Sequence, residues 1–491
     1  MSGKPLWASA LMAGSLITCA AMLARPAWAL DVLLAEQNIS ATPAGAMVPA
    51  ASACPRGAPG QPLQLAEAVA RALCSNPKTR QAWTKVKIQA AMVGQARAAY
   101  LPQVSGNLQA VQERSVIDIK NEPTYGSDYK ARVRSGDVTL SWLLFDFGAR
   151  EATLTNANMQ LEAARATQDA TLQTVFAETA KDYYATQAAM SALKAAAEVE
   201  RMTRKTMDAA GTRADRGVVP ITDALQAQTQ HEQAVFNLTK AQGEAQTALG
   251  KLASGMALAP DMPLEVPEVT DTQGPGKAFS ESVAELMDTV RKNHPSVRAA
   301  QAQYEAALAK VSKTSRQGLP RIDLVAKYSR NNQPESLGLQ GLPTLPATSR
   351  QTYVGLQMSI PFFEGFTRNY QVDQAQAEAE DAQEQLDAAR QQVALDVWSQ
   401  WQALSTATQN VQNSTNLLTI AGQSQRAAQQ RYEAGVGNIL ELLNTQTDLT
   451  NAQQRRIQAL TDWDYARIDL ASKLGRLDAS DLQQMDQKSA P

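Results

Sequence analysis

An internal repeat constrains this 491-residue sequence more than any other feature. When the chain is aligned with itself so that Glu67 meets Glu285, an offset of 218 residues, the match runs without a gap to Gln228. After Gln228 the offset rises to 225, a slip of seven residues or one heptad. The sequence therefore predicts two copies of one structural unit. Other matched pairs are Pro77 and Pro295, Arg80 and Arg298, Pro102 and Pro320, Phe145 and Phe363, Arg150 and Arg368, Arg213 and Arg431, Gly217 and Gly435, Ile221 and Ile439, and, after the slip, Gly250 and Gly475.

Each copy begins with a predicted helix and a predicted hairpin. The helix covers about residues 64–99 or 280–317 and ends before a proline, Pro102 or Pro320. The hairpin covers about residues 102–147 or 320–363, and its strands alternate apolar with polar side chains. This alternation predicts strands and is typical of transmembrane β-barrels. A soluble sheet with one hydrated face would have the same pattern.

A long helix is predicted after each hairpin, over about residues 150–215 and 367–434. At about 1.5 Å per residue, each helix would be on the order of 100 Å long. Neither contains proline, and apolar residues recur every seven positions, as in Val372, Ala379, Leu386 and Val393. This spacing predicts coiled-coil walls that keep much of their surface in water.

Each long helix ends in a similar turn, at residues 216–223 and 434–441. Gly217 or Gly435 is placed to close the incoming helix, and Pro220 or Asn438 is placed to begin the returning one. Two purely structural turns are the simpler interpretation. Because the turn occurs twice, each time at the far end of a long helix, we expect the two tips to form a shared site at one pole.

The first 29 residues are organised as a secretory signal peptide. Lys4 supplies the positive charge, residues 6–23 are uncharged and mostly apolar, and residues 27–29 form a cleavage site. A transmembrane anchor and lipid modification at Cys19 are the alternatives, and the cleavage pattern favours a peptide that is removed. We therefore expect an exported protein.

Two cysteines, Cys54 and Cys74, remain after cleavage. In an oxidising compartment, cysteines at this spacing favour a disulfide over free thiols. The bond would attach an N-terminal extension to the first helix. The predicted organisation is a signal peptide (1–29), this extension (30–62), repeat 1 (63–253), a linker (254–278), repeat 2 (279–477) and a C-terminal tail (478–491).

Composition excludes several classes of protein. The 46 Lys and Arg nearly balance the 48 Asp and Glu, which argues against a nucleic-acid partner. Two histidines and three cysteines argue against a His-rich zinc site or an iron–sulfur cluster. The sequence shows no Ser/His/Asp set and no phosphate-binding glycine loop, which argues against an enzyme. A mean hydropathy of −0.31 excludes a helical protein with several membrane spans.

Export, four amphipathic strands and two helical hairpins together predict an oligomer. Four strands cannot close a barrel, and lipid does not tolerate open strand edges. Several copies would therefore contribute strands to one barrel, and the helices would extend the same tube into the aqueous compartment.

The sequence resembles the TolC-like family of outer-membrane channels from about residue 63 to residue 477. The resemblance rests on Asn76-Pro77 and His294-Pro295, on the strand-to-helix exits at residues 143–148 and 361–365, and on the paired tips. It implies a mixed α and β membrane protein, a homotrimer whose twelve-stranded barrel lies in the lipid of the bacterial outer membrane. A coiled-coil tunnel would continue the barrel into the periplasm. The implied partners are a periplasmic adaptor (a membrane fusion protein) on the tips and an inner-membrane pump, here expected to be an ABC transporter.

The resemblance also implies roles for residues at the tips, and it implies no catalytic residue, metal or cofactor. Tyr432 matches the gating tyrosine of the family, and Asp223 matches its partner on the neighbouring hairpin. Glu441 and Asn444 match two rings at the periplasmic entrance, of which only Glu441 keeps a carboxylate; an ordinary solvated position is the alternative for Glu441. Gly437 stands where some members have an arginine in the latch. The implied adaptor-docking residues are Gly217, Val218, Val219, Pro220, Gly435, Val436 and Gly437.

The leading functional hypothesis is a passive exit duct of a tripartite exporter. The cysteine pair and the Leu-Leu-Phe-Asp-Phe-Gly exit resemble outer-membrane components of type I secretion, which export toxins and adhesins. Efflux of drugs or metabolites is the alternative within the family. A soluble periplasmic coiled-coil scaffold is an alternative of a different class.

Overall fold

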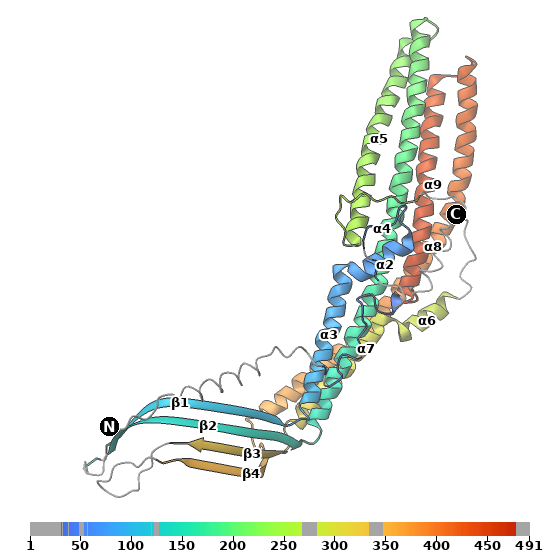
Figure 1. Ribbon diagram of the computed structural model, residues 1–491. Helices are drawn as coiled ribbons and strands as arrows, with labels where there is room; N and C mark the ends of the chain where they lie inside the picture. Colours follow the sequence, from blue (N-terminus) through green and yellow to red (C-terminus); the bar gives the residue numbers. More distant parts are fainter. Residues whose placement is uncertain are drawn as a thin grey trace, which may run out of the picture.

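The computed structural model describes residues 31–48 (except 32 and 38), 54–118 (except 56), 120–121, 127–267, 282–332 and 347–477. The predicted signal peptide with Cys19, the second half of the predicted linker and the C-terminal tail lie outside the described residues. The described chain extends from a sheet at one pole to two helical hairpins at the other (Figure 1).

The two repeats contain the same elements at the same spacing. Every helix of repeat 1 starts and ends 218 residues before its counterpart in repeat 2. The predicted long helices and four strands are confirmed. Repeat 1 comprises α2 (Leu65–Ser75), α3 (Pro77–Ala98), β1 (Gln103–Ile117), β2 (Ser127–Phe145), α4 (Ala149–Asp215) and α5 (Ile221–Gly255). Repeat 2 comprises α6 (Val283–Asn293), α7 (Pro295–Arg316), β3 (Arg321–Asn331), β4 (Ser349–Ser359), α8 (Thr367–Glu433) and α9 (Ile439–Lys473).

The single helix predicted at the start of each copy is wrong, because the structure has two helices there. Asn76 and His294 adopt ψ angles of 133° and 138°, so the chain turns before each following proline. A residue before proline is disfavoured in the helical region, whereas proline itself suits the first position of a helix. The side chains of Asn76 and His294 then cap the second helix of each pair by accepting a backbone N–H.

The predicted change of register after Gln228 is also wrong. Gly250 lies inside α5, whereas Gly475 follows the end of α9 with a φ angle of +66°. The structural counterpart of Gly475 is Ala257, which has a φ angle of +58° and lies at the original offset of 218. Matching glycines by identity was misleading because repeat 1 places an alanine in the left-handed position where repeat 2 has the usual glycine.

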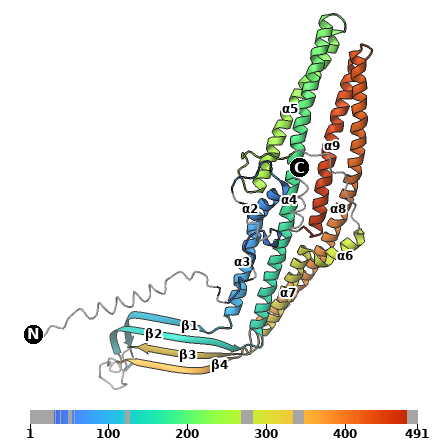
Figure 2. The ribbon, with the colours of Figure 1, turned by 45° about the vertical axis from the view of Figure 1, so that its right-hand side comes forward.

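α4 is the central helix of the protomer. Near the sheet it packs against α3 and α7, and near the tips it packs against α5 and α9 (Figure 2). α8 packs against α6, α7 and α9, so the two hairpins of a protomer meet along a seam between α4 and α9. None of the helices within the described ranges is long and apolar enough to cross a membrane.

The largest apolar core lies part-way along α4. There Phe176, which is fully buried, meets α2 and the end of α5. Elsewhere alanine is the commonest buried residue of α4 and α8, which allows close helix contacts with little apolar bulk. Core residues around Phe176 include Leu65, Val69, Leu73, Leu172, Val175, Leu252 and Met256.

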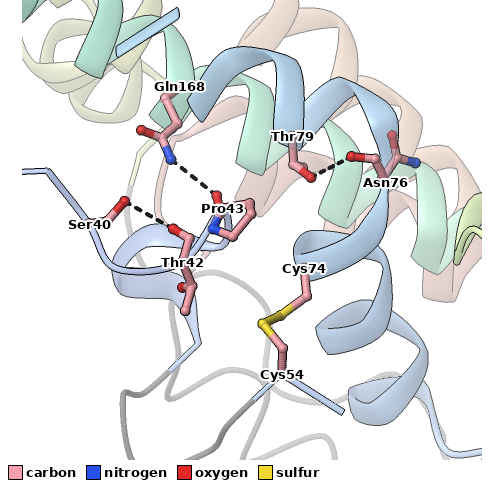
Figure 3. The surroundings of a disulfide bond; sticks show 8 residues. All are labelled: Ser40, Thr42, Pro43, Cys54, Cys74, Asn76, Thr79 and Gln168. Carbon is pink, nitrogen blue, oxygen red and sulfur yellow. Dashed lines mark hydrogen bonds between the residues drawn. A yellow bond between two sulfur atoms is a disulfide. The ribbon is translucent and has the colours of Figure 1, made fainter. Parts of the chain in front are cut away.

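The N-terminal extension is attached to the helical body at several places, and Figure 3 shows two of them. Cys54 and Cys74 form a disulfide, with their Cα atoms 5.8 Å apart, which joins the extension to α2. Before it, the short 3-10 helix η1 (Gly45–Met47) lies beside α4, where Gln168 Nε2 donates a hydrogen bond to the Pro43 carbonyl at 3.1 Å. Trp83 and Arg97 of α3 also donate hydrogen bonds to the carbonyls of Ser40 and Leu33, so the extension is bound to α2, α3 and α4.

The sheet has the order β1-β2-β3-β4, with every neighbouring pair antiparallel. A β-bulge near the end of β2 places Phe145 opposite Ile322. The outer edges of β1 and β4 have no partner strand among the described residues of the protomer. Unpaired edges of this kind require strands from other copies before the sheet can be closed.

The strand-to-helix exit of repeat 1 is a fixed joint. Asp146 accepts hydrogen bonds from the backbone and the side chain of Arg150 at 2.8 and 3.3 Å. The Arg150 guanidinium also donates to the carbonyls of Leu143 and Leu144 at 2.6 and 3.1 Å. The exit predicted from the sequence thus fixes the direction in which α4 leaves the sheet.

Candidate functional site at the helical tips

Tip 1 (residues 213–223) closes α4 with a Schellman arrangement. Val218 N donates to Arg213 O, and Gly217 N donates to Ala214 O, both at 2.9 Å. Gly217 has a φ angle of +70°, which glycine adopts without the strain that a side chain would add. The turn therefore satisfies the last carbonyl groups of a helix that ends in solvent.

Tip 2 (residues 431–441) closes α8 with the same backbone. Val436 N donates to Arg431 O, and Gly435 N donates to Tyr432 O, both at 3.1 Å. Gly435 has a φ angle of +78°. A Cβ atom on Gly437 would lie 2.7 Å from the backbone nitrogen of Tyr432, so this turn is too tight for a side chain. The latch arginine that some family members carry at this position would not fit this backbone.

The return helices begin differently in the two tips. In tip 2, Asn438 caps α9 by accepting a hydrogen bond from Leu440 N at 2.9 Å. In tip 1, Pro220 precedes α5 and provides no side-chain cap. Both solutions turn the chain back along its own helix, and they leave one valine at the end of each hairpin, Val218 and Val436, 70% and 72% exposed.

Tyr432, the predicted gating residue, is buried in tip 2. It is 6% exposed and packs with Ile439, Leu442 and Leu443. Its hydroxyl has no hydrogen-bond partner in the described part of the protomer. A buried hydroxyl without a partner carries a desolvation cost, so a hydrogen-bond acceptor placed beside the Tyr432 hydroxyl would stabilise the protein.

None of the other predicted gate residues forms a hydrogen bond with the Tyr432 hydroxyl in the described part of the protomer. The structure places Asp223 in the first turn of α5, and no hydrogen bond or ion pair to another described residue holds its carboxylate. Glu441 Oε1 lies 3.2 Å from Arg431 Nη1 within tip 2, so its charge is partly compensated. Asn444 is exposed on α9. A single protomer therefore does not form the Tyr432–Asp223 pair.

A contact that the sequence analysis missed joins the two tips. Arg213, on α4, donates to the backbone carbonyls of Tyr432 and Glu433 at 3.0 and 3.2 Å. The carbon of its guanidinium lies 4.7 Å from the centroid of the Tyr432 ring. These are the carbonyls at the C-terminus of α8, where a cation interacts favourably with the helix dipole. Arg213 therefore holds the second hairpin to the first.

The seam between the hairpins continues from this contact toward the core. One level further from the tips, Gln446 Nε2 of α9 donates to Thr206 Oγ1 of α4 at 3.1 Å, with both residues buried. Near the core, burial raises the pKa of Asp464 to about 6, and the Arg467 guanidinium partly opposes that rise. The seam is thus hydrogen-bonded near the tips and contains a titratable group near the core.

With this architecture established, comparison with known proteins defines the family. The sequence profile described as outer membrane efflux protein matches residues 68–257 and 286–476, one match for each repeat. The chain belongs to the outer membrane efflux protein family. It is 32% identical to Protein CyaE of Bordetella pertussis over 418 residues, 84% of this chain and 85% of that protein. It is 24% identical to the outer membrane protein TolC of Escherichia coli, over 84% of this chain and 82% of TolC.

Solved structures show the same fold for this outer membrane efflux protein. VceC of Vibrio cholerae covers 84% of the chain with a TM-score of 0.69 at 20% identity, and 96% of VceC is matched. The open-state channel MtrE of Neisseria gonorrhoeae covers 85% of the chain with a TM-score of 0.70 at 20% identity, and 90% of MtrE is matched. The four strands are thus one protomer's share of a trimeric twelve-stranded barrel in the outer membrane, and the helices form its periplasmic tunnel.

Proposed function

We propose that this outer membrane efflux protein is the exit duct of a tripartite exporter and that its cargo is the polypeptide of a type I secretion system. The main support for a duct is the pair of similar tips at the ends of α4 and α8, two helices of 67 residues each. At about 1.5 Å per residue each helix spans on the order of 100 Å, which suits a passage through the periplasm. The cargo assignment rests on the resemblance of the cysteine pair and the exit at residues 143–148 to type I components.

The tips dock a periplasmic adaptor, which an ABC transporter in the inner membrane drives. Val218 and Val436 support this role because each is an exposed apolar side chain at the end of its hairpin. A partner protein can bury the exposed apolar side chain of such a residue. The neighbouring glycines have no side chain, so the partner can also approach the backbone closely. The other residues proposed to dock are Gly217, Val219, Pro220, Gly435 and Gly437.

Tyr432 and Asp223 act together when the trimer narrows its entrance, where Glu441 and Asn444 line the opening. The Tyr432 hydroxyl is buried without an acceptor, and Asp223 has a carboxylate without a described partner. In the trimer, the carboxylate of Asp223 on a neighbouring hairpin would be the acceptor for this hydroxyl. The double variant Tyr432→Phe with Asp223→Ala should raise single-channel conductance no more than either single variant. Additive increases would show that the two residues act independently.

Secretion by a deletion strain tests the cargo. The strain is complemented with the wild-type gene, with Val218→Asp/Val436→Asp, or with the matched control Val218→Ile/Val436→Ile, which keeps the tips apolar. The Asp variant should lose export of a large type I substrate, whereas the Ile variant should retain it, with drug sensitivity unchanged in both. Outer-membrane trimer levels are measured in parallel so that a folding defect is recognised.

Efflux of small molecules is the second candidate, and the description of the matching family as efflux proteins favours it. The same strains distinguish the two. If a large type I substrate still reaches the medium of the deletion strain while its drug sensitivity rises, the protein serves efflux and the secretion proposal is wrong.

A further inference from the structure

The two faces of the sheet differ, and the strand register shows how. Paired residues of antiparallel strands lie on the same face, so residues with even numbers in β1, β2, β3 and β4 share one face over the paired region. Near the helices this face is apolar, and the opposite face carries mostly polar side chains. In a membrane barrel an apolar face of this kind contacts lipid. Its apolar residues include Val104, Leu108, Val138, Leu140, Trp142, Leu324, Val354 and Leu356.

The same lipid-facing side becomes basic at the end of the sheet farthest from the helices. Six cationic residues lie there, and all six are exposed in the protomer. Arg114 is directly opposite Lys130, and Arg330 is directly opposite Arg350. The six residues, here called the basic patch, are Arg114, Lys130, Arg132, Arg134, Arg330 and Arg350.

Like charges directly opposite each other destabilise a sheet unless an anion lies between them. None of Lys130, Arg132 and Arg134 forms a salt bridge with a carboxylate of the described residues, and the same holds for Arg330 and Arg350. Gln112 and Ala110 face Arg132 and Arg134 across the strand pair and bring no negative charge. These five cations of the basic patch therefore present positive charge that no carboxylate of the described residues compensates, and an external anion would compensate it.

Strand geometry places the basic patch at one boundary of the bilayer. From Phe145 to Gly136, which pairs with Arg330, there are nine residues of β2, about 30 Å along a strand. With the tilt of about 40° usual in barrels, this distance is about 23 Å along the membrane normal, close to the roughly 25 Å height of an apolar band.

Aromatic residues mark the opposite boundary. Phe145, Phe147, Phe362 and Phe363 are exposed and lie at or just after the strand ends that lead into α4 and α8. Aromatic side chains of this kind sit at the level of lipid headgroups. The helices at this end extend into the periplasm. The basic patch, at the other end of the sheet, therefore lies at the level of the outer-leaflet headgroups and just outside them.

We propose that the basic patch binds the phosphate groups of the anionic glycolipid that forms the outer leaflet, with the acyl chains of the lipid against the apolar residues of the same face. Guanidinium groups pair with phosphate through two parallel hydrogen bonds, and five of the six cations are arginine. Three protomers would present the patch around the whole barrel.

Retention of lipid A by the purified trimer tests this proposal. The trimer is placed in nanodiscs of phosphatidylcholine that contain a small fraction of lipid A with both phosphates, and bound lipid A is counted by native mass spectrometry. The test variant is Arg132→Gln/Arg134→Gln. The matched control, Arg321→Gln/Lys327→Gln, removes two cations of the same sheet on the polar face, where Lys327 pairs with Thr139.

At about fivefold per cation near a charged membrane, the test variant should weaken lipid A binding more than tenfold. The control should bind as the wild type does, and dephosphorylated lipid A should bind weakly to all three proteins. Equal retention by the test variant and the wild type would overturn the proposal. So would equal binding of lipid A and phosphatidylglycerol, because the site would then be unselective for the glycolipid.

A measurement on the wild-type trimer alone keeps the proposal testable if the variant does not assemble. Raising the salt concentration shortens the range of charge interactions, so it should release lipid A with both phosphates and leave the dephosphorylated form unaffected. If salt has the same effect on both forms, the acyl chains hold the lipid and the basic patch does not.

Discussion

The two tips share a backbone and differ in what they bury. Ile439 of tip 2 is 2% exposed, whereas its repeat counterpart Ile221 in tip 1 is 64% exposed. The position of Tyr432 in tip 2 is held by Ala214 in tip 1. Tip 2 therefore has a small core of its own, and tip 1 leaves its equivalent apolar side chains at the surface of the protomer.

The same difference decides what two equivalent arginines do. Arg431 stays within its own hairpin and pairs with Glu441 at 3.2 Å. Arg213 instead reaches the other hairpin, because the Tyr432 ring and the end of α8 lie beside it. Repetition of the sequence thus repeats the turn, while one aromatic residue in one copy makes the protomer asymmetric.

The largest effect expected from this asymmetry follows from removing the buried isoleucine. Ile439→Ala should cost about 3 kcal/mol of local stability because it leaves a cavity beside Tyr432, whereas Ile221→Ala should cost less than about 0.5 kcal/mol in the protomer. Hydrogen exchange at the start of α9 should accelerate on the order of 100-fold in the first variant, since exchange there reports local opening.

The control is the first turn of α5 in the same samples, which should keep its wild-type exchange rate in Ile439→Ala. If Ile221→Ala accelerates exchange in α5 as much as Ile439→Ala does in α9, the two tips are equally packed in the trimer. The asymmetry would then be a property of the isolated protomer.

Much of the fold was predictable because its long helices and its strands have periodic patterns of apolar residues. Heptads and the absence of proline located α4 and α8 to within one or two residues, and alternation located all four strands. The breaks at Asn76-Pro77 and His294-Pro295 were visible as a landmark but were not interpreted as ends of helices. The left-handed conformation of Ala257 could not be predicted from the sequence, because glycine and not alanine is the residue expected in that conformation.

The candidate site was less predictable because its contacts cross between hairpins. The turns themselves could be located from Gly217 and Gly435. Arg213 was known only as the match of Arg431, and nothing in either sequence says that one guanidinium stacks on a tyrosine while the other pairs with a glutamate. Such a difference depends on the packing of α4 against α9, which the repeat alone does not specify.

A second effect, smaller than the first, should separate the two arginines. Arg213→Gln removes two charge-assisted hydrogen bonds and the contact with the Tyr432 ring, so it should weaken the attachment of tip 2 by about 2 kcal/mol. Arg431→Gln removes a half-exposed pair and should cost less than about 1 kcal/mol. Planar-bilayer recordings of the trimers should show more frequent or larger openings for Arg213→Gln.

Arg213→Lys serves as the conservative control. It keeps the positive charge near the end of α8 but cannot reach both carbonyls with one planar group, so its effect should be intermediate. Openings that increase more in Arg431→Gln than in Arg213→Gln would show that the pair within tip 2, and not the contact between tips, limits opening.

The smallest effect concerns the seam near the core, where the copies again differ. Asp464 on α9 has Gln246 as its counterpart on α5, so repeat 1 has no carboxyl group at the equivalent position. Burial raises the pKa of Asp464 to about 6, above the value of about 4 for an unfolded aspartate. The folded state therefore binds a proton more readily than the unfolded state. Its stability is greatest below pH 4 with respect to this group and declines as the pH rises through 6.

Thermal unfolding of the trimer at pH 5 and pH 7 measures this contribution. Because Asp464 keeps some contact with solvent and lies near Arg467, we expect it to contribute about 1 kcal/mol per protomer. Asp464→Asn should remove that part of the pH dependence and leave the Tm at pH 7 equal to or above that of the wild type. Gln246→Asp would place a carboxyl group at the equivalent level of repeat 1. If that variant acquires no pH dependence, burial against α4 is specific to α9, and the asymmetry found at the tips extends along the whole seam.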